Sequence, residues 1–251
     1  MRKYIKCDFI RVFRDYKIYL ASIIISIIMN MSVDGNRSDF KSTLAEFQSI
    51  ATSKYMMIIF VVCAAVYACC LVDDLETQYI RYQIVRGKMS DYVISKSLTV
   101  FLSSVFTVVF GVILFVAFNS FFKPMTEPDA FEQVYVQYTC FFNERLILIW
   151  FVVWGIRFGI LAGILSLAAM LTSLFITNKM FVLAMPALIY ELMLEIATEL
   201  GKFDISIFNL AWFRTDYSCN DVWERIRGII FSVICFAVIT ELIIYKLKRR
   251  M

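Results

Sequence analysis

The sequence contains no histidine, and it has only 8 Gly and 3 Pro in 251 residues. The missing histidine excludes His-based catalytic triads and the histidine metal sites of zinc-dependent intramembrane proteases. Charged residues are scarce at 18% of the chain, whereas hydrophobic residues make up 61%, against roughly 45–50% in soluble domains. A soluble core of this length cannot bury so much apolar surface. The composition therefore predicts an all-α integral membrane protein, because lipid offers no hydrogen-bond partners to an open backbone.

Six apolar runs are candidates for membrane-spanning helices, each of which needs about 20 apolar residues. Only the short turn Thr177-Asn178-Lys179 separates the fourth run from the fifth. A single helix through both would be about 78 Å long, so two spans are favoured over one span followed by a re-entrant piece. The predicted spans are 18–33, 55–72, 98–122, 146–176, 180–197 and 228–245.

The distribution of basic residues predicts the orientation of these spans. Six spans place both termini on one side of the membrane, and that side carries most of the 25 Lys and Arg residues. Basic residues close to spans favour the cytoplasm. We therefore expect a multi-pass protein of the plasma (cytoplasmic) membrane with both termini inside the cell, and we expect membrane lipids rather than nucleic acid as its partners.

Three features outside the spans carry further predictions. Residues 1–17 show an apolar face at helical spacing, which predicts an amphipathic interfacial helix; the alternative is a charged stop before the first span. Residues 203–213 are apolar but too short to cross, so they predict a short external helix or, alternatively, a loop packed on the protein. Cys140 and Cys219 fall in predicted loops and form the candidate disulfide.

The polar stretch between the second and third spans has helical periodicity of its own. Its apolar and aromatic positions are Leu75, Tyr79, Tyr82 and Val85. The run Arg86-Gly87-Lys88 is typical of a helix end, because glycine favours the residue after a helix and cations favour its last turn. Ser90 is then expected to cap the next helix. The pattern predicts a short amphipathic helix on the cytoplasmic face.

Together these features resemble the ABC-2 family of membrane subunits of ABC transporters, which have six spans. In that family the segment between the second and third spans carries a coupling helix that docks on the ATPase subunit. Asp91 departs from the family pattern, which usually has a basic residue there. The residues that carry the local match are Asp74, Glu76, Arg86, Gly87, Ser90, Tyr92 and Lys96.

The resemblance implies that residues 1–251 are a single transmembrane permease domain of an ATP-driven exporter. It implies short external helices between the fifth and sixth spans, and a second copy or a homologous permease subunit as partner. ATP and Mg²⁺ would bind to a separate ATPase subunit, and this chain would bind no cofactor. The residues expected to couple to the ATPase are Asp74, Glu76, Tyr79, Tyr82, Arg86, Gly87 and Lys88.

Missing motifs agree with a role other than catalysis. No G-x-x-x-x-G-K-[ST] loop is present, since Gly201-Lys202 is followed by Phe203. No nucleophile stands beside a recognisable base, so the chain is not expected to be an enzyme or to hold a metal. Two other functions remain as alternatives: a non-transporting immunity or assembly partner in the membrane, and a proton-coupled carrier.

Charged residues inside the predicted spans are costly, so they are candidates for function. Arg157 interrupts the fourth span, and Glu191 and Glu195 lie one turn apart in the fifth, with Glu199 extending the row. Counting 1.5 Å per residue places the arginine and the glutamates at similar depth near the outer leaflet. We expect a stabilising cluster of these four residues; the alternatives are the lining of a substrate path and a proton relay.

Overall fold

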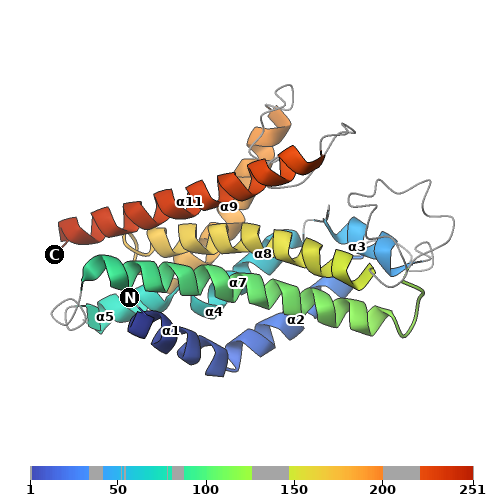
Figure 1. Ribbon diagram of the computed structural model, residues 1–251, viewed down its shortest axis with the longest axis horizontal. Helices are drawn as coiled ribbons and strands as arrows, with labels where there is room; N and C mark the ends of the chain where they lie inside the picture. The colour runs from blue at the N-terminus through green and yellow to red at the C-terminus, as the bar shows by residue number, and fades with distance from the viewer. Residues whose placement is uncertain are drawn as a thin grey trace.

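The computed structural model describes residues 2–33, 42–51, 53, 55–77, 79–80, 88–125, 147–199 and 221–250. The secondary structure in these ranges is helical and forms an elongated bundle (Figure 1). Both chain ends lie at the same end of the bundle, which we call the termini end; the opposite end is the far end. The helices are α1 (Arg2–Arg14), α2 (Lys17–Met31), α3 (Thr43–Ala51), α4 (Met56–Tyr67), α5 (Cys70–Glu76), α7 (Met89–Asn119), α8 (Ile147–Thr172), α9 (Lys179–Glu199) and α11 (Asp221–Arg250).

Four helical segments are long and apolar enough to cross a membrane: Met56–Glu76, Met89–Asn119, Ile147–Thr172 and Ile229–Arg249. They confirm the all-helical fold expected from the composition and agree with a multi-pass membrane protein. The first and fifth predicted spans also form helices, α2 and α9. However, α2 has only 15 residues, and α9 contains Pro186.

The central helix is α7, which packs against α1, α2, α4, α8 and α11. Its 31 residues are about 46 Å long, more than a bilayer core of about 30 Å requires. The neighbouring helix α2 runs parallel to it, since Ser22 Oγ donates to the Thr107 carbonyl at 3.1 Å and Asn119 Nδ2 donates to Asn30 Oδ1 at 3.2 Å. Such polar contacts help to join helices inside a membrane.

A stripe of glycines brings α8 close to α7. A Cβ added to Gly159 would lie 2.8 Å from Val105 Cα, and one added to Gly163 would lie 2.6 Å from the Phe101 ring, whereas one added to Gly155 would meet nothing nearer than 3.5 Å. Small residues at every fourth position let two membrane helices approach closely. The pairing also shows that α8 runs antiparallel to α7.

The chain reverses between α8 and α9, as the sequence predicts for the turn at 177–179. The reversal occupies residues 173–178 at the termini end. From there α9 runs antiparallel to α4: Lys179 contacts Asp73, and further along the Tyr190 ring lies 4.9 Å from that of Phe60. The interpretation of 146–197 as two helices is therefore confirmed, although α9 is not among the four long apolar segments.

The short helix α3 is inserted into the core at the far end (Figure 1). Phe47 is 2% exposed. Glu46, also buried, forms an ion pair with Lys123, which follows α7. No apolar run of spanning length marks this helix in the sequence. The aromatic side chains around Phe47 are Phe115, Trp150, Phe151 and Phe158.

Two details of the segment between the second and third spans differ from expectation. The predicted cap at Ser90 is wrong, because α7 already begins at Met89, after Lys88 in extended conformation with no side-chain cap. The residues from Asp73 to Glu76 do not start a new helix. They complete α5, which continues α4 after a turn at residues 68–69. The external helix predicted at 203–213, and Cys140 and Cys219, lie outside the described residues.

Candidate functional site

The strongest candidate for a functional residue is Lys96, a lysine enclosed within the termini end. Its side chain is only 2% exposed, and it lies about 10 Å along α7 from Met89. Lysine is almost never fully buried unless its charge is paired. The surroundings of Lys96 therefore have to supply a counter-charge.

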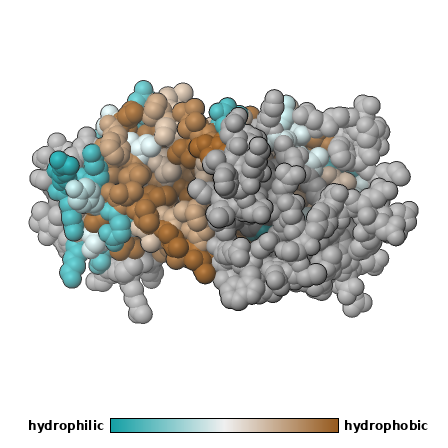
Figure 2. Space-filling view, turned by 90° about the horizontal axis from the view of Figure 1, so that it is seen from above, coloured by the Kyte–Doolittle hydropathy of each residue, from teal (hydrophilic) through white to brown (hydrophobic). Residues whose placement is uncertain are grey.

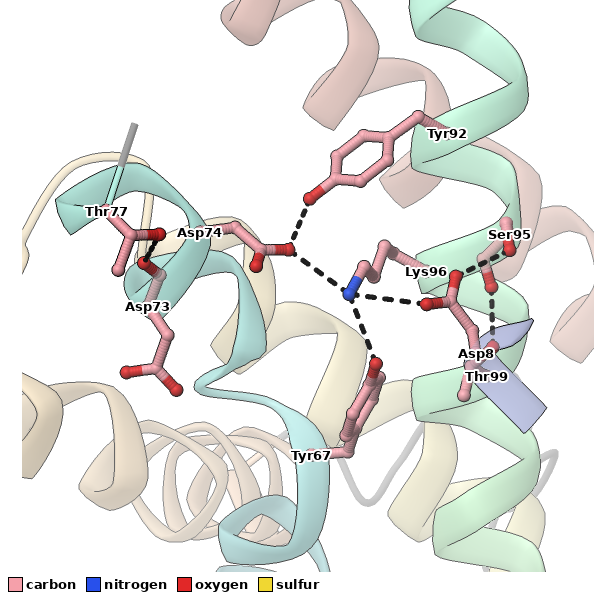
Figure 3. A network of polar contacts seen from close by, with 9 residues as sticks. All are labelled: Asp8, Tyr67, Asp73, Asp74, Thr77, Tyr92, Ser95, Lys96 and Thr99. Carbon is pink, nitrogen blue, oxygen red and sulfur yellow. Dashed lines mark hydrogen bonds and ion pairs between the residues drawn. The ribbon is translucent and has the colours of Figure 1, made fainter. Parts of the chain in front are cut away.

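Two carboxylates from other helices supply it (Figure 3). Lys96 Nζ lies 3.1 Å from Asp74 Oδ2 on α5 and 3.4 Å from Asp8 Oδ1 on α1. Three segments thus meet at one ammonium group: the N-terminal helix, the residues just after the second predicted span and the residues just before the third.

Three hydroxyl groups complete the arrangement. Lys96 donates to Tyr67 Oη at 3.1 Å, Tyr92 donates to Asp74, and Ser95 Oγ donates to Asp8 Oδ2 at 2.7 Å. The ammonium group also lies 5.3 Å from the centre of the Tyr67 ring. A connected polar network of this kind fixes a single geometry. We call Asp8, Tyr67, Asp74, Tyr92, Ser95 and Lys96 the Lys96 network.

The Lys96 network is suited to holding helices together. It contains one formal positive charge and two negative charges, joined by the hydroxyl groups of three side chains. Among the described residues, no group of three or more His, Cys, Asp or Glu is placed to hold a metal ion. Breaking such a buried pair is strongly destabilising, so α1, α5 and α7 are held in fixed register at this end.

A second, exposed set of ion pairs surrounds α5. Lys179 Nζ, in the first turn of α9, lies 2.6 Å from Asp73 Oδ1 and 3.5 Å from Glu76 Oε2. The hydrogen bond to Asp73 raises the pKa of Lys179 above its ordinary value. Exposed ion pairs contribute little to stability. These contacts therefore help to orient α5 but add little to the stability of its packing.

The structure separates the residues predicted to couple to an ATPase into two groups. Asp74 is turned inward into the Lys96 network, whereas Glu76, Tyr79 and Lys88 are exposed. Tyr79 is 41% exposed, which makes it the clearest candidate for contact with a partner. Tyr82, Arg86 and Gly87 lie outside the described residues. Docking through residues 73–90 stays a prediction.

The charged residues predicted to lie inside the membrane are in the half of the bundle away from the Lys96 network. Arg157 is half-buried, with its guanidinium 4.8 Å from the centre of the Trp154 ring. Glu191 and Glu195 are exposed. Each lies about 200° around α9 from the residue two positions earlier, Ile189 and Met193 respectively. Ile189 and Met193 are the α9 residues that meet α8 and α11. The side chain of Glu199 is outside the described residues. Pairing between Arg157 and the glutamates stays a prediction.

Sequence reasoning missed the partners of Lys96. Asp8 is the member that a pattern could have revealed, because it shares a helical face with the buried Val12 four residues later. An acidic side chain on the apolar face of a basic helix is buried when that face packs, so it needs a cationic side chain on the neighbouring helix. The Glu46–Lys123 pair gave no comparable signal, since nothing in its local sequence indicates that α3 is buried.

Comparison of the chain with protein families, with curated proteins and with solved structures finds no match.

Proposed function

We propose that this chain is the membrane subunit of an ATP-driven exporter of the ABC-2 type, docking a separate ATPase subunit through residues 73–90. The observation that carries the proposal is the arrangement of the termini end. There the chain leaves the second predicted span along α5, presents Tyr79 to solvent, and returns to the bundle at α7.

The proposed topology has six crossings, with both termini in the cytoplasm. The helices support it by their alternating directions: α2, α7 and α9 run away from the termini end, whereas α4–α5, α8 and α11 run toward it (Figure 1). The basic tail of α11, from Lys246 to Arg250, belongs to the termini end. Basic residues next to a span favour the cytoplasmic side.

In the proposed mechanism the Lys96 network transmits movement between the docking segment and the spans. Asp74 belongs to the helix that leads into the docking segment, Asp8 to the interfacial helix, and Lys96 to the central helix α7. A displacement of α5 by an ATPase would therefore act on α1 and α7 together. Lys96 is a positioning residue in this scheme, since it acts through Asp74 and touches no substrate.

The proposal is tested by co-purification with a candidate ATPase subunit, followed by measurement of ATP hydrolysis by the complex. Tyr79→Ala should leave the protein in the membrane and weaken ATPase binding. The matched control is Tyr245→Ala, an exposed tyrosine on α11 at the same end of the bundle. It should bind the ATPase as the unaltered protein does.

Three outcomes separate the alternatives. Loss of binding in Tyr79→Ala but not in Tyr245→Ala supports docking through residues 73–90. Equal binding by both variants and the unaltered protein argues against this docking surface. A stable complex whose ATP hydrolysis does not respond to any exported compound would instead favour a non-transporting membrane partner.

A further inference from the structure

The outward face of α1 carries charges that the rest of the described fold does not use. This helix runs along the flank of the bundle near the termini end (Figure 1). Its inward face is occupied, because Asp8 belongs to the Lys96 network and Val12 is buried. On the other side of the helix, Arg11 and Arg14 are exposed. Neither arginine forms an ion pair or a hydrogen bond with another residue that the structure describes.

The two arginines line an open hollow on this outward face. Ile10, whose side chain is 54% exposed, borders the same hollow. One carboxylate, that of Asp15, also borders it, and Lys17 engages this carboxylate through its backbone N at 3.2 Å and its Nζ at 3.5 Å. The hollow therefore combines an excess of positive charge with an exposed apolar side chain.

The hollow lies at the level where the apolar part of α7 begins. Helix α2 runs parallel to α7, with Ser22 level with Thr107. Lys17 comes five residues before Ser22, so it is level with about Leu102 of α7. The third predicted span begins at Leu98, which is within about 6 Å of that level. The hollow beside Lys17 is therefore close to the boundary between hydrocarbon and headgroups.

Aromatic side chains and surface polarity mark the same boundary. Tyr16 and Tyr19 follow the two arginines and are both exposed, and tyrosine is enriched where hydrocarbon meets the headgroups. Figure 2 looks onto the face of the bundle that carries α11, where hydrophilic side chains at the termini end give way to apolar ones toward the middle. The outward face of α1 thus lies at the headgroups of the leaflet at the termini end.

From these observations we propose that the outward face of α1 binds an anionic phospholipid of this leaflet. Its phosphate lies between the guanidinium groups of Arg11 and Arg14, whose planar donors match phosphate oxygens, and Ile10 contacts the start of an acyl chain. The cation of a zwitterionic headgroup would meet Lys17 and the arginines, so a headgroup with net negative charge is preferred. A bound lipid also holds Asp8, on the same helix, against α7. The inference requires only that the helices lie in a membrane, so it stands or falls independently of the exporter assignment.

The test is native mass spectrometry of the whole protein in mild detergent, with phosphatidylglycerol and phosphatidylcholine of identical acyl chains. The unaltered protein should bind phosphatidylglycerol in preference to phosphatidylcholine. The double variant Arg11→Gln with Arg14→Gln should lower the apparent affinity for phosphatidylglycerol about thirtyfold, since each cation near the headgroups contributes about fivefold. Arg11→Lys with Arg14→Lys keeps both charges and should retain most of the affinity.

The matched control is Lys248→Gln with Arg249→Gln. It removes two exposed cations from α11 at the same end of the bundle and should leave the affinity for phosphatidylglycerol nearly unchanged. An excess of inorganic phosphate should not displace the lipid, because the free ion makes no apolar contact with Ile10.

Equal binding of the two lipids by the unaltered protein would overturn the inference. Equal losses in the two Gln double variants would also do so, since they would indicate a diffuse attraction to positive charge at this end. Displacement by inorganic phosphate would indicate a site for a soluble anion instead of a lipid. If the α1 double variant fails to fold, the single variants Arg11→Gln and Arg14→Gln decide, each with an expected loss of about fivefold.

Discussion

Replacing Lys96 with methionine is the most direct perturbation of the Lys96 network. Methionine keeps much of the side-chain volume but removes the charge, so Asp8 and Asp74 face each other without a cation. Their side chains are only 14% and 9% exposed. Removing one partner of a buried pair costs about 3–5 kcal/mol, and we expect the lower part of this range because Asp8 retains some contact with solvent.

Companion variants give the expected order of stability. Lys96→Arg retains the charge and should lose less than Lys96→Met. Asp8→Asn should be mild, at about 1 kcal/mol, since Asp74 still neutralises Lys96 and the network then has no net charge. The double variant Lys96→Met with Asp74→Asn should recover part of the loss, because only one buried carboxylate remains.

The measurement is thermal unfolding of the purified protein in detergent. At roughly 2–4 °C per kcal/mol for a chain of this size, a loss of about 3–4 kcal/mol in Lys96→Met should lower the midpoint by about 6–16 °C. The control Lys248→Met removes an exposed lysine near the end of α11 and should stay close to the unaltered protein. A midpoint for Lys96→Met that matches this control, or no recovery in the double variant, would refute the reasoning.

Three further predictions address other parts of the fold. Gly159→Ala should destabilise by about 1–3 kcal/mol through overpacking against the backbone of α7, while Gly155→Ala should fold normally; comparing their thermal midpoints checks the close helix contact. Lys123→Met should destabilise more than Glu46→Gln in the same assay. Lys123→Met leaves the carboxylate of Glu46, which is 2% exposed, buried without this counter-charge, whereas Glu46→Gln leaves Lys123, which is 20% exposed and in contact with solvent. In a variant whose seven native cysteines are replaced, a single thiol introduced as Arg250→Cys should be unreactive toward an impermeant reagent in intact cells and reactive in opened ones; labelling from outside would contradict the proposed orientation.

The long apolar helices were predictable because a membrane-spanning helix needs a long apolar run, and such a run can be read directly from the local sequence. The runs at 98–122 and 146–176 correspond to the apolar parts of α7 and α8 for this reason. Helix ends were less predictable. In α7 the helix begins at Met89, two residues earlier than a cap at Ser90 would place it, and its first turns hold Tyr92 and Lys96, which bond to side chains of other elements.

The candidate site could be predicted only in part. Asp74 and Lys96 were named from the resemblance to a family pattern, but their contact with each other and with Asp8 depends on how distant segments pack. The glycine stripe was readable in principle, because Gly155, Gly159 and Gly163 recur at a spacing typical of close helix contacts. The burial of Glu46 was not, since it follows from the tertiary position of α3.

The order of the Lys96 network along the chain has a consequence for biosynthesis. Asp8 and Asp74 both precede Lys96, so a ribosome completes the two acidic partners before the lysine emerges. Chains assemble from the N-terminal side during synthesis, and a lone lysine is costly to place in hydrocarbon. When α7 joins the bundle, both acidic partners of Lys96 have therefore already been synthesised. Asp8 can reach Lys96 only once α7 is present, so the contact of α1 with α7 marks the point at which α1, α5 and α7 become one unit.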